Sequence, residues 1–191
     1  ALKVLIKMML RSGECRTAFR GAAEDDAGRL LLSLSSAADS AGASVRDRCN
    51  AIMTICMFAD DRPSEAPAML LLKVTHGRIL ETLVRELTTG PPETCGRACQ
   101  ALVVLMRTKP SVVVPQVLAV GSDDGRSSPL MKGLARVVDL GEPMLNTLAD
   151  CAAKLLMDWD PDDAAFKVEH EATATIAKML RHRDMIDTSL H

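Results

Sequence analysis

The acidic segment near the carboxyl end of the chain holds the side chains best spaced for chemistry. Asp158, Asp160, Asp162 and Glu169 occupy positions 1, 3, 5 and 12 of a twelve-residue stretch. Calcium loops between helices place carboxylates at these positions, because Ca²⁺ takes about six to eight oxygen ligands. Position 6, where the sharp turn needs glycine, holds Asp163. Two interpretations follow: a calcium-responsive loop, or acidic residues that cap the next helix and face its N-terminal dipole.

Sequence signatures of the common enzyme classes do not occur in this chain. It has no glycine-rich phosphate loop, no GxSxG nucleophile elbow and no HExxH zinc motif. The six cysteines include no CxxC pair, and no histidine lies at ligand spacing from them. We therefore expect a non-enzymatic protein with no cofactor, no metal and no small-molecule substrate. Reduced thiols would place it in an intracellular, cytoplasmic compartment.

Composition and charge limit the classes of partner. The 191 residues carry a net charge of −2 and only 2% aromatic residues, with no Tyr. Base stacking on aromatic rings and whole-chain attraction to nucleic acid or anionic lipid are therefore not expected. No apolar run reaches the length of about 20 residues that a membrane span needs. The charge is nevertheless uneven, since the first twenty residues are basic and residues 158–171 are acidic.

Helical periodicity and turn residues divide the chain into helices, and the 11 Met suit close packing between them. Prolines lie near the proposed starts and glycines near the proposed ends. The stretch 121–129, rich in Gly and Ser, is expected to be an exposed loop. The predicted helices cover residues 2–20, 27–40, 44–59, 64–75, 78–89, 92–108, 111–120, 128–140, 143–158 and 163–183.

Two of these helices recur in the sequence at nearly one spacing. Residues 49–56 align with 99–106 at an offset of 50, with matching apolar positions. Residues 83–87 align with 134–138 at an offset of 51, and that offset also places 101–106 onto 152–157. A pair of helices that repeats in the same order indicates a repeat architecture, in which stacked units bury one continuous core.

The best-formed unit, residues 64–108, resembles an armadillo repeat. The resemblance rests on residues 74–80, where Gly77 separates the short first helix from the second, on Leu83, Val84 and Leu87, and on residues 97–105. It implies an all-α protein, a right-handed α-α superhelix (solenoid) of about three armadillo-like repeats. The single domain 1–191 would hold units 2–59, 64–108 and 111–158, with an acidic loop and a terminal or capping helix in 159–191. Helical pairs of the HEAT type remain an alternative.

The resemblance also implies a concave face lined by the third helix of each unit. Thr54, Val104 and Leu155 stand where the family often has asparagines that hold an extended peptide. Asn50, Gln100 and Cys151 stand at the family's frequent Trp position. An apolar row edged by polar groups suits a helix or a folded partner better than an extended strand. The sequence therefore predicts a protein–protein interaction module or scaffold, part of a larger protein or assembly, with a calcium-responsive helical protein as the alternative. The predicted partner-binding residues are Asn50, Thr54, Gln100, Val104, Cys151 and Leu155.

Overall fold

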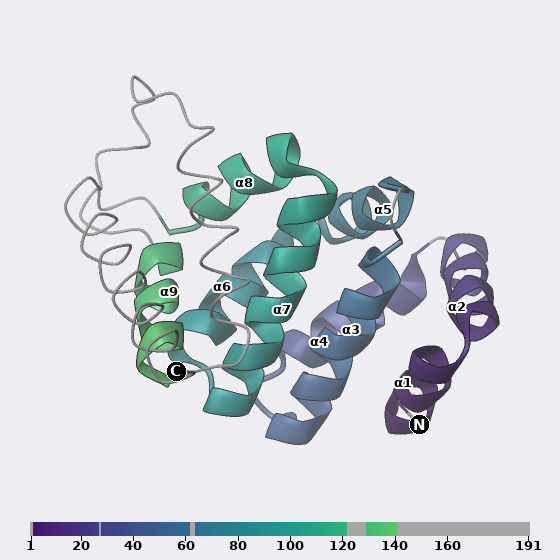
Figure 1. The fold of residues 1–191 in the computed structure, drawn as a ribbon, viewed down its shortest axis with the longest axis horizontal. Helices are drawn as coiled ribbons and strands as arrows, with labels where there is room; N and C mark the ends of the chain where they lie inside the picture. Colours follow the sequence, from purple (N-terminus) through teal and green to yellow (C-terminus); the bar gives the residue numbers. More distant parts are fainter. Residues whose placement is uncertain (1, 27, 62–63, 122–128, 141–191) are drawn as a thin grey trace, which may run out of the picture.

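The computed structural model describes residues 2–26, 28–61, 64–121 and 129–140, which form nine α-helices and no strand (Figure 1). This confirms the predicted all-α class. No helix within these ranges is long and apolar enough to cross a membrane. The helices expected at 143–158 and 163–183 lie outside the described residues. The nine are α1 (Leu2–Arg11), α2 (Gly13–Asp25), α3 (Arg29–Asp39), α4 (Val45–Ala59), α5 (Ala66–Thr75), α6 (Arg78–Thr89), α7 (Pro92–Thr108), α8 (Pro110–Ala119) and α9 (Pro129–Leu140).

The single helix predicted over residues 2–20 is two helices, because the chain breaks at Ser12. Ser12 is extended, and its hydroxyl accepts a hydrogen bond from the Cys15 N–H at 3.3 Å. Serine at the N-cap satisfies one of the N–H groups that the first turn of a helix leaves unpaired. The cap therefore starts α2 anew and lets α1 take its own direction.

The turn between α5 and α6 has the glycine that the sequence predicted. His76 ends α5 in the left-handed region with φ 50°, and Gly77 follows with φ 75°. The N–H groups of both residues bond back to carbonyls in the last turn of α5, His76 to Leu72 and Lys73 and Gly77 to Leu72. Two successive left-handed residues reverse the chain tightly, and a glycine tolerates this without a side-chain clash.

Helices that follow one another in the sequence pack in pairs (Figure 1). Within each pair, α3 lies against α4 and α6 lies against α7. Between pairs, α4 packs against α7, α6 packs against α9, and α1 covers another side of α4. The apolar stripes expected on residues 78–89 and 92–108 are buried where these helices meet, and Leu83 and Leu102 have no exposed surface. Helices α4, α6 and α7 thus form the centre of the core.

Candidate functional site

Helices α4 and α7 lie side by side, and each leaves one stripe of side chains incompletely buried. The residues in each stripe are three or four positions apart, so they share one side of their helix. We call the two stripes together the α4–α7 face. It comprises Arg46, Asn50 and Met53 on α4, and Glu93, Arg97, Gln100, Val104 and Arg107 on α7.

Cys49 shows how the starts of the two stripes adjoin. This half-buried thiol of α4 lies close enough to Glu93 and Arg97 of α7 to sense both charges. Burial is the main reason that its pKa is raised, Glu93 adds to the increase, and Arg97 opposes it. The thiol therefore stays protonated near neutral pH and serves as a packing group at the junction of α4 and α7.

The structure distributes the predicted partner-binding residues between the face and the core. Asn50, Gln100 and Val104 are partly exposed on the α4–α7 face. Thr54 is fully buried, and its hydroxyl donates to the Asn50 carbonyl at 2.8 Å. Because its polar group is satisfied within α4 and its surface is covered, Thr54 belongs to the helix packing and not to the exposed face. The other two predicted residues, Cys151 and Leu155, lie outside the described residues.

Three arginines of the face, Arg46, Arg97 and Arg107, are exposed and were not among the predicted residues. The Arg97 guanidinium donates to the Gln100 side-chain oxygen at 3.2 Å. Sequence reasoning overlooked the three because it compared only positions matched to the family. The usable signal was helical spacing: once the buried side of α7 is assigned, Arg97 and Arg107 must lie on the opposite side.

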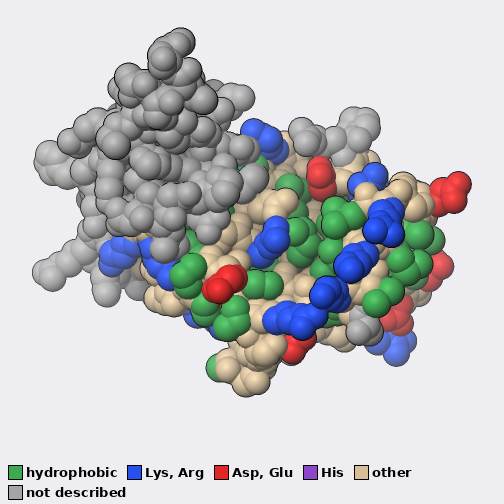
Figure 2. Space-filling model, turned by 60° about the horizontal axis from the view of Figure 1, so that its bottom comes forward, with side chains coloured by type: hydrophobic (Ala, Val, Ile, Leu, Met, Phe, Trp, Pro, Cys, Tyr) green, Lys and Arg blue, Asp and Glu red, His purple; other side chains and the backbone are tan. Residues whose placement is uncertain are grey.

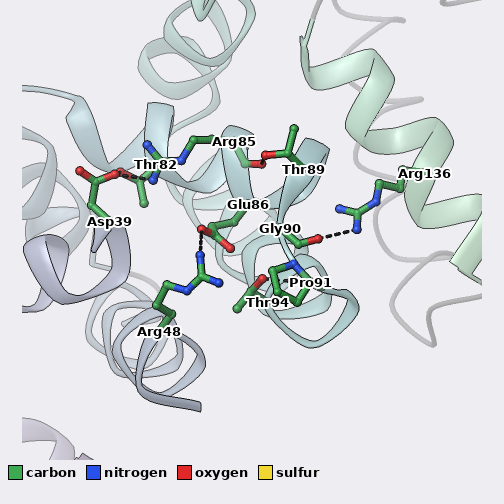
Figure 3. Close-up of polar contacts among 10 residues, drawn as sticks. All are labelled: Asp39, Arg48, Thr82, Arg85, Glu86, Thr89, Gly90, Pro91, Thr94 and Arg136. Atoms are coloured by element: carbon green, nitrogen blue, oxygen red, sulfur yellow. Dashed lines mark hydrogen bonds and ion pairs between the residues drawn. The ribbon is translucent and has the colours of Figure 1, made fainter. Parts of the chain in front are cut away.

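A buried ion pair fixes α4 against α6 (Figure 3). The Arg48 guanidinium meets the Glu86 carboxylate at 2.7 Å, with side-chain exposures of 17% and 3%. Within the described part of the chain, the second oxygen of Glu86 and the Nε of Arg48 have no hydrogen-bond partner. An ion pair buried with incomplete hydrogen bonding gives little net stability, but loss of one partner strands the other charge.

Arg85 and Arg136 each contact the carboxyl end of another helix (Figure 3). Arg85 of α6 pairs with Asp39 at the carboxyl end of α3, and Thr82 donates to the same carboxylate oxygen at 3.1 Å. Arg136 of α9 donates to the Leu87 carbonyl at 3.1 Å and to the Gly90 carbonyl at the carboxyl end of α6. Arg136 follows Arg85 by 51 residues, the offset at which residues 83–87 align with 134–138. Each arginine thus binds the end of a neighbouring helix.

Both contacts suit the electrostatics of helix ends. The carboxyl end of a helix carries partial negative charge from unpaired carbonyls, and a guanidinium supplies donors and charge together. The hydrogen bond from Arg85 is the main reason that the pKa of Asp39 lies below its usual value. This carboxylate is therefore ionised at neutral pH and keeps the ion pair to Arg85.

A third arginine, Arg20, holds the carboxyl end of α4. It extends from α2 and donates to the carbonyls of Phe58 at 3.2 Å, Met57 at 3.3 Å and Asp60 at 2.7 Å. Its guanidinium also pairs with the Asp61 carboxylate at 2.6 Å. The end of α4 is thereby tied to α2, and the α4–α7 face rests on helices fixed at several points.

The predicted calcium ligands Asp158, Asp160, Asp162 and Glu169 lie outside the described residues. Within residues 2–26, 28–61, 64–121 and 129–140, no group of three or more His, Cys, Asp or Glu could hold a metal ion.

Comparison with known proteins identifies no relative of this chain. No family model matches it. No curated protein and no solved structure matches it either.

Proposed function

We propose that this chain is a non-enzymatic scaffold of armadillo type that binds another protein on its α4–α7 face. In this proposal α4 and α7 are the third helices of adjacent units, α3, α6 and α9 are second helices, and the stack has about three units. The bound partner would be a helix, a peptide or a folded subunit of a larger assembly.

One observation carries the proposal: helices whose sequences align at an offset of about 50 residues pack on one another. The pairs α4 with α7 and α6 with α9 each join helices about one repeat apart, as stacked units require. The contacts of Arg85 and Arg136 support the same register, because each reaches back to a helix end in the preceding unit. A stack of this kind presents its third helices as one broad surface.

The side chains of the face suit a folded or helical partner with acidic groups. Arg46, Arg97 and Arg107 offer forked donors that match carboxylates, and Asn50 and Gln100 both donate and accept. Interfaces commonly use Arg as an anchor beside apolar groups, which Met53 and Val104 supply here. Arg20 and the Arg48–Glu86 ion pair hold α4, and α7 packs against α4 and α6. The surface is therefore arranged before a partner binds.

Affinity capture from native lysate, read by mass spectrometry, tests the proposal. The bait variant Gln100→Glu/Val104→Glu places two charges on the face and removes Val104 from its apolar side chains. The matched control Gln116→Glu/Leu32→Glu changes one glutamine and one aliphatic residue to glutamate at exposed positions of α8 and α3. Circular dichroism establishes that all three baits are helical and melt alike.

Loss of one set of proteins with the face variant alone, followed by direct binding of one of them in purified form, supports the proposal. Equal recovery with wild type, face variant and control contradicts it. Catalytic turnover of a substrate by the purified chain would contradict the non-enzymatic part.

A further inference from the structure

Helix α1 lies beside α2 at the edge of the described fold (Figure 1). Basic and aliphatic side chains are exposed on one of its sides. Ile6 and Met9 are buried, and Leu2 and Leu5 are partly buried, on the side that packs against α4 and α2. The exposed residues occupy the opposite side. This outer side of α1, which we call the α1 outer face, comprises Lys3, Val4, Lys7, Met8, Leu10 and Arg11.

The cations of the α1 outer face are available for a partner. Lys3, Lys7 and Arg11 are spaced by four residues, so they form one row along the helix, and α1 has no acidic residue. None of the ion pairs within the described part of the chain involves them. In Figure 2 a row of Lys and Arg side chains crosses the molecular surface with hydrophobic side chains beside it.

Exposed aliphatic side chains are concentrated on the same helix. Val4, Met8 and Leu10 are 62%, 49% and 63% exposed. Among the large hydrophobic side chains whose surroundings the structure describes, only Leu32 and Met69 are also exposed. Three exposed aliphatic side chains among the ten residues of one helix form a surface whose burial away from water is favourable.

A partner of this face must satisfy cations and aliphatic groups together. The α1 outer face combines a row of cations with exposed aliphatic side chains. Charge complementarity matches such a face to an anionic surface that has hydrocarbon close beneath it. The boundary of an anionic bilayer offers phosphate oxygens for the cations and, a few ångströms deeper, hydrocarbon for the aliphatic side chains.

We propose that the α1 outer face binds the surface of membranes that contain anionic phospholipids. The helix lies along the bilayer, its lysine and arginine side chains reach the phosphates, and Val4, Met8 and Leu10 enter the boundary between headgroups and acyl chains. The contact is peripheral and reversible, because ten residues bury too little apolar surface for permanent insertion. The two faces share no residue, so the membrane contact is tested independently of the proposed protein partner.

Sedimentation of the full chain with vesicles tests this proposal. The probes are vesicles of phosphatidylcholine alone and of phosphatidylcholine with about 30% phosphatidylserine, a composition that gives a negative surface potential. One variant, Lys3→Gln/Lys7→Gln/Arg11→Gln, removes the cations, and another, Val4→Ser/Met8→Gln/Leu10→Ser, removes the aliphatic groups. Matched controls change exposed residues elsewhere: Arg29→Gln/Lys73→Gln/Arg78→Gln for charge, and Leu32→Ser/Met69→Gln for apolar surface.

The proposal expects binding to the anionic vesicles that disappears in about 1 M salt, where charges are screened beyond about 3 Å. The cation variant should partition about a hundredfold more weakly, since each cation near an anionic surface contributes about fivefold. The aliphatic variant should lose at least about tenfold, and both controls should bind like wild type.

Three results would overturn the proposal. They are no binding to anionic vesicles at low salt, equal binding by the cation variant and wild type, and an equal loss in the charge control, which would assign the attraction to overall charge. Melting curves identify any variant that is unfolded. If the triple variant does not fold, Lys7→Glu alone must weaken binding at least about fivefold.

Discussion

Breaking the buried ion pair between Arg48 and Glu86 should destabilise the fold far more than breaking an exposed pair. The substitution Arg48→Met leaves the Glu86 carboxylate, whose side chain is 3% exposed, without its counter-charge. Glu86→Leu likewise leaves the Arg48 guanidinium without its counter-charge. An exposed pair between the end of α2 and the start of α3, Arg29 with Asp26, provides the control at side-chain exposures of 82% and 46%.

The magnitude follows from burial. Loss of one partner of a buried pair costs about 3–5 kcal/mol in free energy of unfolding, because the remaining charge cannot recover its hydration. Replacement of both by apolar side chains of similar volume, Arg48→Met/Glu86→Leu, should restore stability to within about 1 kcal/mol of wild type. Arg29→Met should cost no more than about 0.5 kcal/mol, because water already solvates both exposed groups.

Urea unfolding of the four variants and wild type, followed by circular dichroism, measures these differences as a double-mutant cycle. The reasoning is refuted if Arg48→Met costs less than about 1 kcal/mol, since Glu86 would then be reached by water. It is also refuted if the double variant loses the sum of the single losses, since the two charges would then act independently.

Three further variants or measurements probe other contacts. Arg20→Met should cost about 2–4 kcal/mol in urea unfolding by freeing the carboxyl end of α4, whereas exposed Arg16→Met on the same helix should cost less than about 0.5. Gly90→Ala should lower stability by about 2 kcal/mol, because its Cβ would lie 2.4 Å from a Glu86 carboxylate oxygen. Gly21→Ala should raise stability by about 0.5–1 kcal/mol, because its Cβ would meet nothing within 4 Å. Thermal melts compare the two variants. Burial raises the pKa of Cys56 to about 12, above its unfolded value of 9.0, so its contribution to stability is complete below pH 9 and falls as pH rises toward 12. Cys56 should therefore resist iodoacetamide at pH 8 until urea unfolds the chain, and labelling in the native state would contradict this burial.

Local pattern determined the helices and their buried sides. The bounds predicted for residues 78–89 and 92–108 are those of α6 and α7, and the glycine at the α5–α6 turn is in the conformation that the prediction requires. These features depend on neighbours within about four residues along the chain, so spacing, caps and glycine positions carry the information. The all-α class followed from the same local signals.

Tertiary contacts decided which residues on the outer side of α4 are exposed in the folded protein. The same helical spacing places Asn50, Met53 and Thr54 near one another on α4, yet Thr54 is fully buried and its neighbours are only partly covered. The amount of surface left on α4 depends on how closely α1, α3 and α7 approach it. The spacing of residues within α4 carries no information about how closely the other helices approach it.

The sequence by itself determined where helices form and which sides turn inward, and the tertiary structure decided what their charged side chains bind. Arg20, Arg85 and Arg136 look alike in the sequence, as long cations on helices. In the structure they reach the ends of other helices, across 37 to 49 residues of chain. Such contacts join atoms that only packing brings together, because a helix end attracts any cation within reach and the fold alone sets which cation is within reach.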